Sequence, residues 1–377
     1  MVHGIYIHIP FCRRKCTYCD FNSFPDREGL ISLYLTALRQ EIYTYARRLN
    51  VITPIKSLYF GGGTPTLLTG EGLRSLLDFC CRSFPVDACA EITIEANPEG
   101  LSEEKLTVLR RAGFNRLSLG VQSFDDYQLI RLGRGHCAVE IQQTVAAARI
   151  SGFENLSIDL IYALPGQGIE MWKNDILKAL ELSPDHLSAY ALTLEEGTPL
   201  FREYLQGELT LPDEDSQVTM YRMIQEIFSA RGYRHYEISN FSIPGREARH
   251  NLLYWHNQEY LGMGAGAHSY LAGRRYSNIS QVEEYIEAVK CQGSAVCEEE
   301  RPTLFQQAGE TIMLGLRLMD GLDLSDFAHR FNCSLEKIYP EALDNLITEG
   351  LLSSQGKYLK LTPKGILLSN EVFSEFL

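Results

Sequence analysis

The sequence predicts an α/β fold, a partial (β/α)6 barrel, followed by a small winged-helix-like domain at the C-terminus. Three observations lead to this expectation. Short apolar runs typical of buried strands alternate with segments of helical periodicity six times between residues 4 and 190. Polar or glycine residues lie at the carboxyl ends of these runs, where parallel barrels and sheets place their sites. Beyond residue 300, helical segments precede a hairpin pattern.

The alternation can be followed along the chain in order. The six expected parallel strands cover residues 4–9, 57–60, 91–95, 117–121, 156–161 and 186–190. The expected helices that alternate with them lie near residues 30–48, 72–82, 102–112, 138–151 and 170–182. A helix near residues 214–231 and an edge strand at 236–241 are expected next. The tail is expected to form helices at 305–318, 324–331 and 335–349, then a hairpin around residues 354–357.

Length and composition suit a globular protein with one large and one smaller domain. The chain has 377 residues, of which 45% are hydrophobic and 22% are charged. Its net charge of −13 argues against broad binding to nucleic acid or anionic membranes, which favour a basic protein. No apolar run reaches the roughly 18 residues that a membrane helix requires, and no secretory signal precedes the first strand. We therefore expect a cytoplasmic protein that is not an integral membrane protein.

Three cysteines lie within eight residues, directly after the first expected strand. Cys12, Cys16 and Cys19 have C-x3-C-x2-C spacing, so that one short loop can wrap three thiolates around a single centre. Thiolates bind soft metals, and such compact loops suit iron–sulfur clusters. Three ligands on a four-iron cluster would leave one iron open for a small molecule. The alternatives are an accidental grouping, thiol redox chemistry, and structural zinc, which usually requires a second cysteine pair that is missing downstream.

The insert Arg13-Arg14-Lys15 places positive charge beside these thiols. A neighbouring cation lowers the pKa of a thiol, so the insert is expected to favour the thiolates that a cluster needs. An ordinary solvated basic turn is the other interpretation. The seven remaining cysteines are scattered along the chain and are interpreted as small hydrophobic residues.

Polar and glycine residues at successive strand ends predict one ligand pocket. The stretch Gly61–Thr64 allows a ligand to approach the backbone closely, and it lacks the spacing of a nucleotide-phosphate loop. Glu95, Gln122 and Asp159 occupy equivalent positions on later strands, and Arg134 follows in a glycine-rich turn. A plain turn, a helix cap or a solvated charge would explain each of them singly. Their recurrence on successive strands favours a pocket around one ligand.

A histidine beside aromatic residues, His250, carries an imidazole of the kind that binds heme iron. It begins the string His250-Asn251-Leu252-Leu253-Tyr254-Trp255, which offers an imidazole beside stackable rings. A histidine next to aromatic residues is more often a packed structural histidine. His268, in a glycine-rich turn, is a weaker candidate, and His256 is weaker still.

The cysteine spacing resembles the signature of the radical S-adenosylmethionine (SAM) enzymes. The string from Tyr6 to Cys12, YIHIPFC, is similar to the group that holds the oxygen-independent coproporphyrinogen oxidase HemN and the heme chaperone HemW. The strings GGGTP at 61–65, IE at 94–95, GVQSF at 120–124 and DLIYALPG at 159–166 resemble SAM-contact motifs of that group. One position separates the two types. HemN has a fourth cysteine two residues after the third, whereas this chain has Phe21 there, as HemW does.

The resemblance implies a [4Fe-4S] cluster held by Cys12, Cys16 and Cys19, with SAM on its open iron. In this group electron transfer to SAM gives methionine and a 5′-deoxyadenosyl radical. The HNxxYW string marks HemW-like proteins, which implies that His250 is the leading candidate for the heme ligand, with Tyr254 and Trp255 as a wall. The residues implied as SAM contacts are Tyr6, Tyr18, Gly62, Gly63, Thr64, Glu95, Gln122, Arg134 and Asp159.

The same resemblance implies a domain division and a role for the tail. Residues 1–235 would form the radical SAM barrel, 236–299 a connecting region with the HNxxYW string, and 300–377 a HemN-type C-terminal domain. A winged-helix-like domain suggests DNA binding, but residues 300–377 hold seven Lys and Arg against eleven Asp and Glu. A lid or a partner surface on the heme side is therefore expected instead.

The favoured hypothesis is a heme chaperone that binds heme and delivers it to hemoproteins, possibly membrane-bound respiratory enzymes. The missing fourth cysteine, the missing N-terminal extension of HemN and the HNxxYW string all point to it. One alternative is a coproporphyrinogen III oxidase that decarboxylates two propionates to vinyl groups. Another is a cluster-bearing binding or electron-transfer protein, which explains the cysteines but not the strand ends. No catalytic residue is assigned, and the sequence leaves open SAM cleavage, the recipients, the heme-iron ligand and the oligomeric state.

Overall fold

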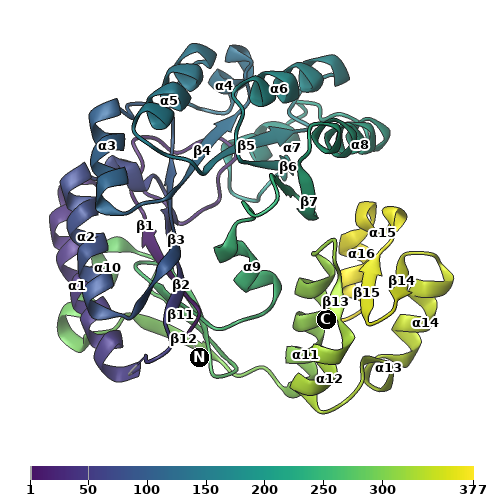
Figure 1. Cartoon of the computed structure of the whole chain (residues 1–377). Helices are drawn as coiled ribbons and strands as arrows, with labels where there is room; N and C mark the ends of the chain where they lie inside the picture. The colour runs from purple at the N-terminus through teal and green to yellow at the C-terminus, as the bar shows by residue number, and fades with distance from the viewer. Residues whose placement is uncertain (1, 50) are drawn as a thin grey trace.

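A curved sheet of twelve strands carries most of the molecule in the computed structural model, which describes residues 2–49 and 51–377 (Figure 1). The spatial order is β12-β11-β10-β9-β1-β2-β3-β4-β5-β6-β8-β7, and β1 to β6 are parallel neighbours. These strands are β1 (Gly4–Ile9), β2 (Ile55–Gly62), β3 (Val86–Ala96), β4 (Arg116–Gln122), β5 (Leu156–Tyr162), β6 (His186–Ala191), β7 (Arg234–Glu237), β8 (Asn240–Ser242), β9 (Tyr260–Met263), β10 (His268–Leu271), β11 (Arg274–Asn278) and β12 (Val296–Glu300). The six predicted parallel strands are confirmed.

Helices cover the outer face of this sheet, and one short helix, α9, lies on its inner side (Figure 1). Side chains that point outward from β1, such as Ile5 and Ile7, are fully buried in the main hydrophobic core. The helices of this part are α1 (Ile31–Leu49), α2 (Gly70–Ser83), α3 (Glu103–Ala112), α4 (Asp126–Arg131), α5 (Ala138–Ile150), α6 (Ile169–Glu181), α7 (Pro199–Leu205), α8 (Glu214–Ala230), α9 (Arg249–Trp255) and α10 (Val282–Gln292). Short 3₁₀ helices span Glu28–Leu30 and Pro65–Leu67.

Local sequence explains where several of these helices begin and end. The side chain of Ser102 accepts a hydrogen bond from the Lys105 backbone N–H and caps α3, which ends at Gly113 with a φ of 116°. The other helices whose first turn is capped by a side chain begin after Thr69, Asp125, Thr198, Asp213, Thr303, Asp323 and Thr362.

The C-terminal part has its own core and a three-stranded sheet of order β13-β15-β14. Its elements are α11 (Leu304–Leu316), β13 (Leu322–Asp323), α12 (Leu324–Phe331), α13 (Leu335–Ile338), α14 (Pro340–Thr348), β14 (Leu352–Gln355), β15 (Tyr358–Leu361), α15 (Pro363–Leu367) and α16 (Ser369–Ser374). The predicted hairpin is confirmed as β14 and β15. No helix among the described residues is long and apolar enough to cross a membrane.

Three sequence predictions need correction. The helix expected at 335–349 is two helices, because Pro340 cannot continue α13 and instead starts α14. The single edge strand expected at 236–241 is two short strands, β7 and β8, and β8 runs antiparallel to β6. Strands β9 to β12 were not expected. They extend the sheet beyond β1, so residues 260–300 belong to the same sheet as the barrel strands. The division at residues 235 and 299 stays a prediction.

Candidate cofactor site in the barrel

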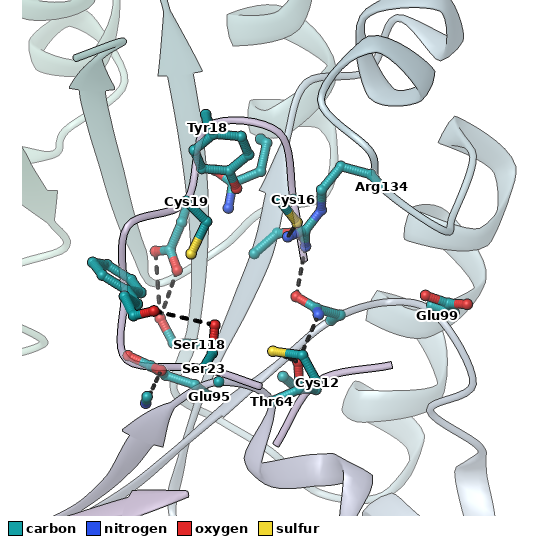
Figure 2. Close-up of a pocket in the computed structure, with 18 of the residues that line it drawn as sticks. Cys12, Cys16, Tyr18, Cys19, Ser23, Thr64, Glu95, Glu99, Ser118 and Arg134 are labelled. Atoms are coloured by element: carbon teal, nitrogen blue, oxygen red, sulfur yellow. Dashed lines mark hydrogen bonds between the residues drawn. The ribbon is translucent and has the colours of Figure 1, made fainter. Parts of the chain in front are cut away.

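A cavity of about 500 Å³ lies on the inner side of the sheet, toward the carboxyl ends of the parallel strands. The cysteine loop closes one side of it, and Figure 2 shows its sulfur atoms with residues of β3, β4 and the turn after α4. All of the predicted cluster and SAM residues except Tyr6 line this cavity: Cys12, Cys16, Tyr18, Cys19, Gly62, Gly63, Thr64, Glu95, Gln122, Arg134 and Asp159. The structure therefore brings together residues from the cysteine loop, from four strands, and from the turns after β2 and α4.

Backbone hydrogen bonds fix the cysteine loop to the barrel. The Cys12 N–H donates to the Phe24 carbonyl at 3.2 Å, which closes the loop at its base. At its far end, the Thr17 N–H donates to the Leu132 carbonyl at 3.1 Å, and the Thr17 carbonyl accepts from the Leu200 N–H at 3.0 Å. The loop is thus attached at both ends, as preorganisation of three metal ligands requires.

Polar side chains lie beside two of the three thiols. Among the described residues, no three His, Cys, Asp or Glu side chains are grouped as they would be around one metal ion. Cys12 Sγ lies 3.6 Å from Thr64 Oγ1, and Arg134 Nη1 donates to Cys16 Sγ at 3.5 Å. Donors directed at sulfur stabilise thiolate ligands and tune a cluster.

The basic insert lowers the pKa of Cys12 and Cys19 through the Lys15 charge, as expected, but the net pKa of both thiols is raised. Burial raises the pKa of both thiols, and it outweighs the opposing effect of the Lys15 charge. Arg14 lies 3.2 Å from Glu99, so part of the insert's charge is paired. The Lys15 ammonium donates to the Ser23 hydroxyl at 3.0 Å and to the Phe21 carbonyl. Lys15 therefore also stabilises the end of the cysteine loop through these hydrogen bonds.

Gly63, in the turn after β2, packs closely against the cysteine loop. A Cβ there would lie 2.6 Å from the Phe11 carbonyl oxygen and 3.0 Å from Cys12 Sγ. We expect Gly63→Ala to push the cysteine loop outward and to lower cluster content after anaerobic reconstitution, measured as iron per chain and as absorbance of the cluster. Gly29→Ala is the matched control, because nothing lies within 4 Å of its Cβ. Equal iron content in both variants would contradict this reading of the close approach.

Glu95 is a half-buried carboxyl in the cavity wall. Its Oε1 accepts from the Tyr59 hydroxyl at 2.7 Å, and its Oε2 accepts from the Gly62 N–H at 3.1 Å. Burial raises the pKa of Glu95 to about 7, since the ionised form loses its hydration. Carboxyl groups with a perturbed pKa that line a cavity are candidates for functional residues. Glu95 offers oxygens to a ribose hydroxyl or an amino group.

A second carboxyl, Asp159, and a buried arginine, Arg116, also line the cavity. Asp159 accepts hydrogen bonds from Ser118 Oγ at 3.1 Å and from Ser157 Oγ at 3.2 Å, and burial raises its pKa. Arg116 is 2% exposed, and its Nε has no hydrogen-bond partner. His136, which also lines the cavity, leaves its Nδ1 unpartnered. The Arg116 Nε is thus an unsatisfied donor, and the His136 Nδ1 is an unsatisfied acceptor because the other ring nitrogen donates to the Val121 carbonyl at 3.2 Å.

The HNxxYW string forms helix α9 and stands inside the barrel. The Glu91 carboxylate accepts from the N–H groups of Arg249 and His250, at 3.0 and 3.1 Å, and so anchors the start of α9. Asn251 lines the cofactor cavity. Trp255 lies under the Arg317 guanidinium, 4.5 Å from ring centre to Cζ, and joins the barrel to the C-terminal part.

His250 itself is 1% exposed, and both of its ring nitrogens are engaged. Nδ1 is hydrogen-bonded to Ser57 Oγ at 2.8 Å and Nε2 to Tyr254 Oη at 2.9 Å, while the ring stacks on Tyr59. Burial lowers the pKa of His250 to about 3, so the imidazole is neutral. Neither nitrogen is free for heme iron in this conformation. Tyr6, whose hydroxyl is hydrogen-bonded to His8, lines a neighbouring cavity.

Comparison with known proteins agrees with this geometry. Residues 6–179 match the model of the radical SAM superfamily, and residues 303–368 match that of the HemN C-terminal domain. The chain is 41% identical to the heme chaperone HemW of Lactococcus lactis, over 100% of this chain and 97% of that one. It is 39% identical to the Bacillus subtilis heme chaperone HemW, over 99% and 98%. The chain belongs to the HemW family of radical SAM proteins.

A solved structure in the same superfamily confirms the fold. The coproporphyrinogen III oxidase HemN of Escherichia coli, described as a radical SAM enzyme, superposes with a TM-score of 0.86. It is 28% identical, and the match covers 99% of this chain and 89% of that one. The predicted α/β architecture with a HemN-type C-terminal domain is therefore confirmed.

Several cavity residues of this HemW-family chain were not predicted from its sequence. Asn97 accepts from Arg134 Nη2 at 2.5 Å and donates to Thr64 Oγ1 at 3.1 Å, so it links two predicted residues. Asn97 could have been predicted to line the cavity, because it directly follows Glu95 and Ala96 at the carboxyl end of β3. Arg116 lies at the amino end of β4, away from the strand ends that were searched. The other cavity residues outside the prediction include Tyr59, Ser118, His136, Ser188, Tyr190 and Asn251.

Proposed function

We propose that the protein is a cytoplasmic heme chaperone that binds heme and delivers it to hemoproteins. The observation that carries the proposal is the full-length identity of 41% with a heme chaperone HemW, which spans both the barrel and the tail. Position 21, where the resemblance implies a fourth cysteine in a coproporphyrinogen oxidase, is a phenylalanine that is exposed beside the cavity. Membrane-bound respiratory enzymes are candidate recipients.

We also propose that Cys12, Cys16 and Cys19 hold a [4Fe-4S] cluster and that SAM occupies the rest of the cavity. The cluster would supply an electron to SAM and a site for its amino and carboxylate groups. Gly62, Gly63 and Thr64 would let that part of SAM approach the β2 turn. The contacts proposed for the remainder of SAM are Tyr18, Glu95, Gln122, Arg134 and Asp159.

Within this site the protein's own groups bind and orient. Glu95 and Asp159 present carboxylate oxygens to ligand hydroxyl or amino groups, and their burial makes these hydrogen bonds strong. Arg134 directs one nitrogen to Cys16 Sγ and another to Asn97, so it positions the loop against the strand ends. The cysteine loop covers the cavity and restricts water around the cofactor.

The test compares two activities of anaerobically reconstituted protein. We expect heme titration to give saturable binding, and we expect coproporphyrinogen III with SAM and a reductant to yield no protoporphyrinogen. Iron content and SAM binding are measured on the same preparation. They show that a lack of protoporphyrinogen is not caused by a missing cluster or missing SAM. Formation of protoporphyrinogen, with no saturable heme binding, would contradict the proposal and identify an oxidase.

A further inference from the structure

A second cavity, of about 440 Å³, adjoins the cofactor cavity inside the barrel. Four residues line both cavities, so the two share a wall at the end of the cysteine loop: Asp20, Phe21, Gly62 and Glu95. The second cavity is bounded by β1, helix α9 and the turn before β10. Its volume lies within the range of roughly 300–1,000 Å³ that is usual for sites of small molecules and cofactors.

Aromatic rings dominate the wall of this second cavity. Tyr6 comes from β1, Tyr254 from α9 and Tyr260 from β9. The rings of Tyr254 and Tyr260 pack edge to face, with 4.6 Å between their centres. Phe21 adds a ring that is 63% exposed at the junction with the cofactor cavity. An exposed phenylalanine at a cavity mouth is a surface for a flat, apolar ligand, because aromatic rings stack on such ligands.

Two histidines line the second cavity, and they differ in whether their ring nitrogens are hydrogen-bonded. His8 is buried, and its Nδ1 and Nε2 are taken by Tyr6 Oη at 3.0 Å and by the Asn22 carbonyl at 2.8 Å. His268, at the start of β10, is exposed, and its side chain makes no hydrogen bond within residues 2–49 and 51–377. An imidazole with a free nitrogen is a ligand for heme iron.

We infer that the second cavity is the heme site, with His268 as a ligand of the iron and Phe21 stacked on the macrocycle. This inference rests on the proposed function, since it takes heme as the cargo. In this arrangement His250 of the HNxxYW string does not bind the heme iron itself. The hydrogen bond between His250 and Tyr254 holds the Tyr254 ring in the cavity wall, so His250 is a positioning residue.

The test titrates heme, and separately iron-free protoporphyrin IX, into reconstituted protein loaded with SAM. We expect His268→Ala to weaken heme binding roughly tenfold or more and to remove the optical signature of histidine ligation, while protoporphyrin IX still binds. Added imidazole should restore that signature. Phe21→Ala should weaken binding of both porphyrins roughly threefold to tenfold, as loss of a stacked ring predicts. His329→Ala, at an exposed histidine of α12, is the matched control and should behave as wild type.

The outcomes separate this inference from the proposed function. If wild type binds no heme, the proposed function itself fails. If wild type binds heme and the His268→Ala protein keeps the same affinity and signature, the chaperone stands and the assignment of His268 is overturned. Circular dichroism and iron content of each variant show that the fold and the cluster are intact, so that a loss of heme binding reports on the site.

Discussion

Replacing Glu95 by glutamine is expected to stabilise the fold at pH 8 and to weaken SAM binding. An unfolded glutamate loses its proton near pH 4.5, whereas burial raises the pKa of folded Glu95 to about 7. The free energy of unfolding of the wild type therefore falls as pH rises from 4.5 through 7. Glutamine lacks this penalty, so the variant should gain about 1–3 kcal/mol at pH 8 and little at pH 4.5. Urea unfolding at both pH values measures this difference.

The same substitution removes a charged acceptor from the cavity, so SAM affinity should drop roughly tenfold or more in calorimetric titration. Glu41→Gln is the matched control for binding. Glu41 is a buried carboxyl whose pKa burial likewise raises to about 7, but it accepts from Tyr285 and the Gly264 N–H outside the cavity. A Glu95→Gln protein that binds SAM as tightly as the wild type would remove Glu95 from the proposed contacts.

Removing the Glu91 carboxylate is expected to loosen helix α9 and destabilise the barrel. Glu91 accepts from the first two N–H groups of α9, and its charge lies near the buried guanidinium of Arg116. Glu91→Ala leaves these donors without their carboxylate, which should cost about 3 kcal/mol of unfolding free energy. Amide exchange of residues 249–257 should also become faster than in the wild type. Urea unfolding and hydrogen exchange measure the two effects.

Glu226→Ala is the control for this experiment, because Glu226 is an exposed residue of α8. It should leave both the unfolding midpoint and the exchange of α9 unchanged. If Glu91→Ala unfolds at the wild-type urea concentration and α9 exchanges at the wild-type rate, the account of how the HNxxYW helix is held inside the barrel is wrong.

The sequence alone was sufficient for the parallel strands and most of the cofactor cavity. Parallel strands align their carboxyl ends, so Gly62, Glu95, Gln122 and Asp159 had to meet once the alternation of strands and helices was recognised. The cysteine loop was equally local, since its three thiols are held within eight residues. These features depend on spacing along the chain, which a single sequence displays.

The site residues and pKa shifts that the sequence did not predict depend on packing between segments far apart in the chain. Arg116 reaches the cavity from the amino end of β4, and Asn251 reaches it from a helix more than a hundred residues later. His250 looked like an accessible ligand beside aromatic rings, yet α9 turns it toward Ser57 and buries it. The charge of Lys15 suggested lowered thiol pKa values, but burial of the loop reverses the sign. Burial is a property of the assembled fold.

The most direct test of the chaperone proposal is the rate of heme transfer to an apo-hemoprotein. Reconstituted protein carrying one heme is mixed with increasing concentrations of the apo form of a b-type hemoprotein from the same cell. A chaperone that hands heme over within a complex predicts a rate that rises with acceptor concentration. A rate independent of acceptor concentration, equal to spontaneous dissociation of heme, would contradict delivery and leave only heme binding.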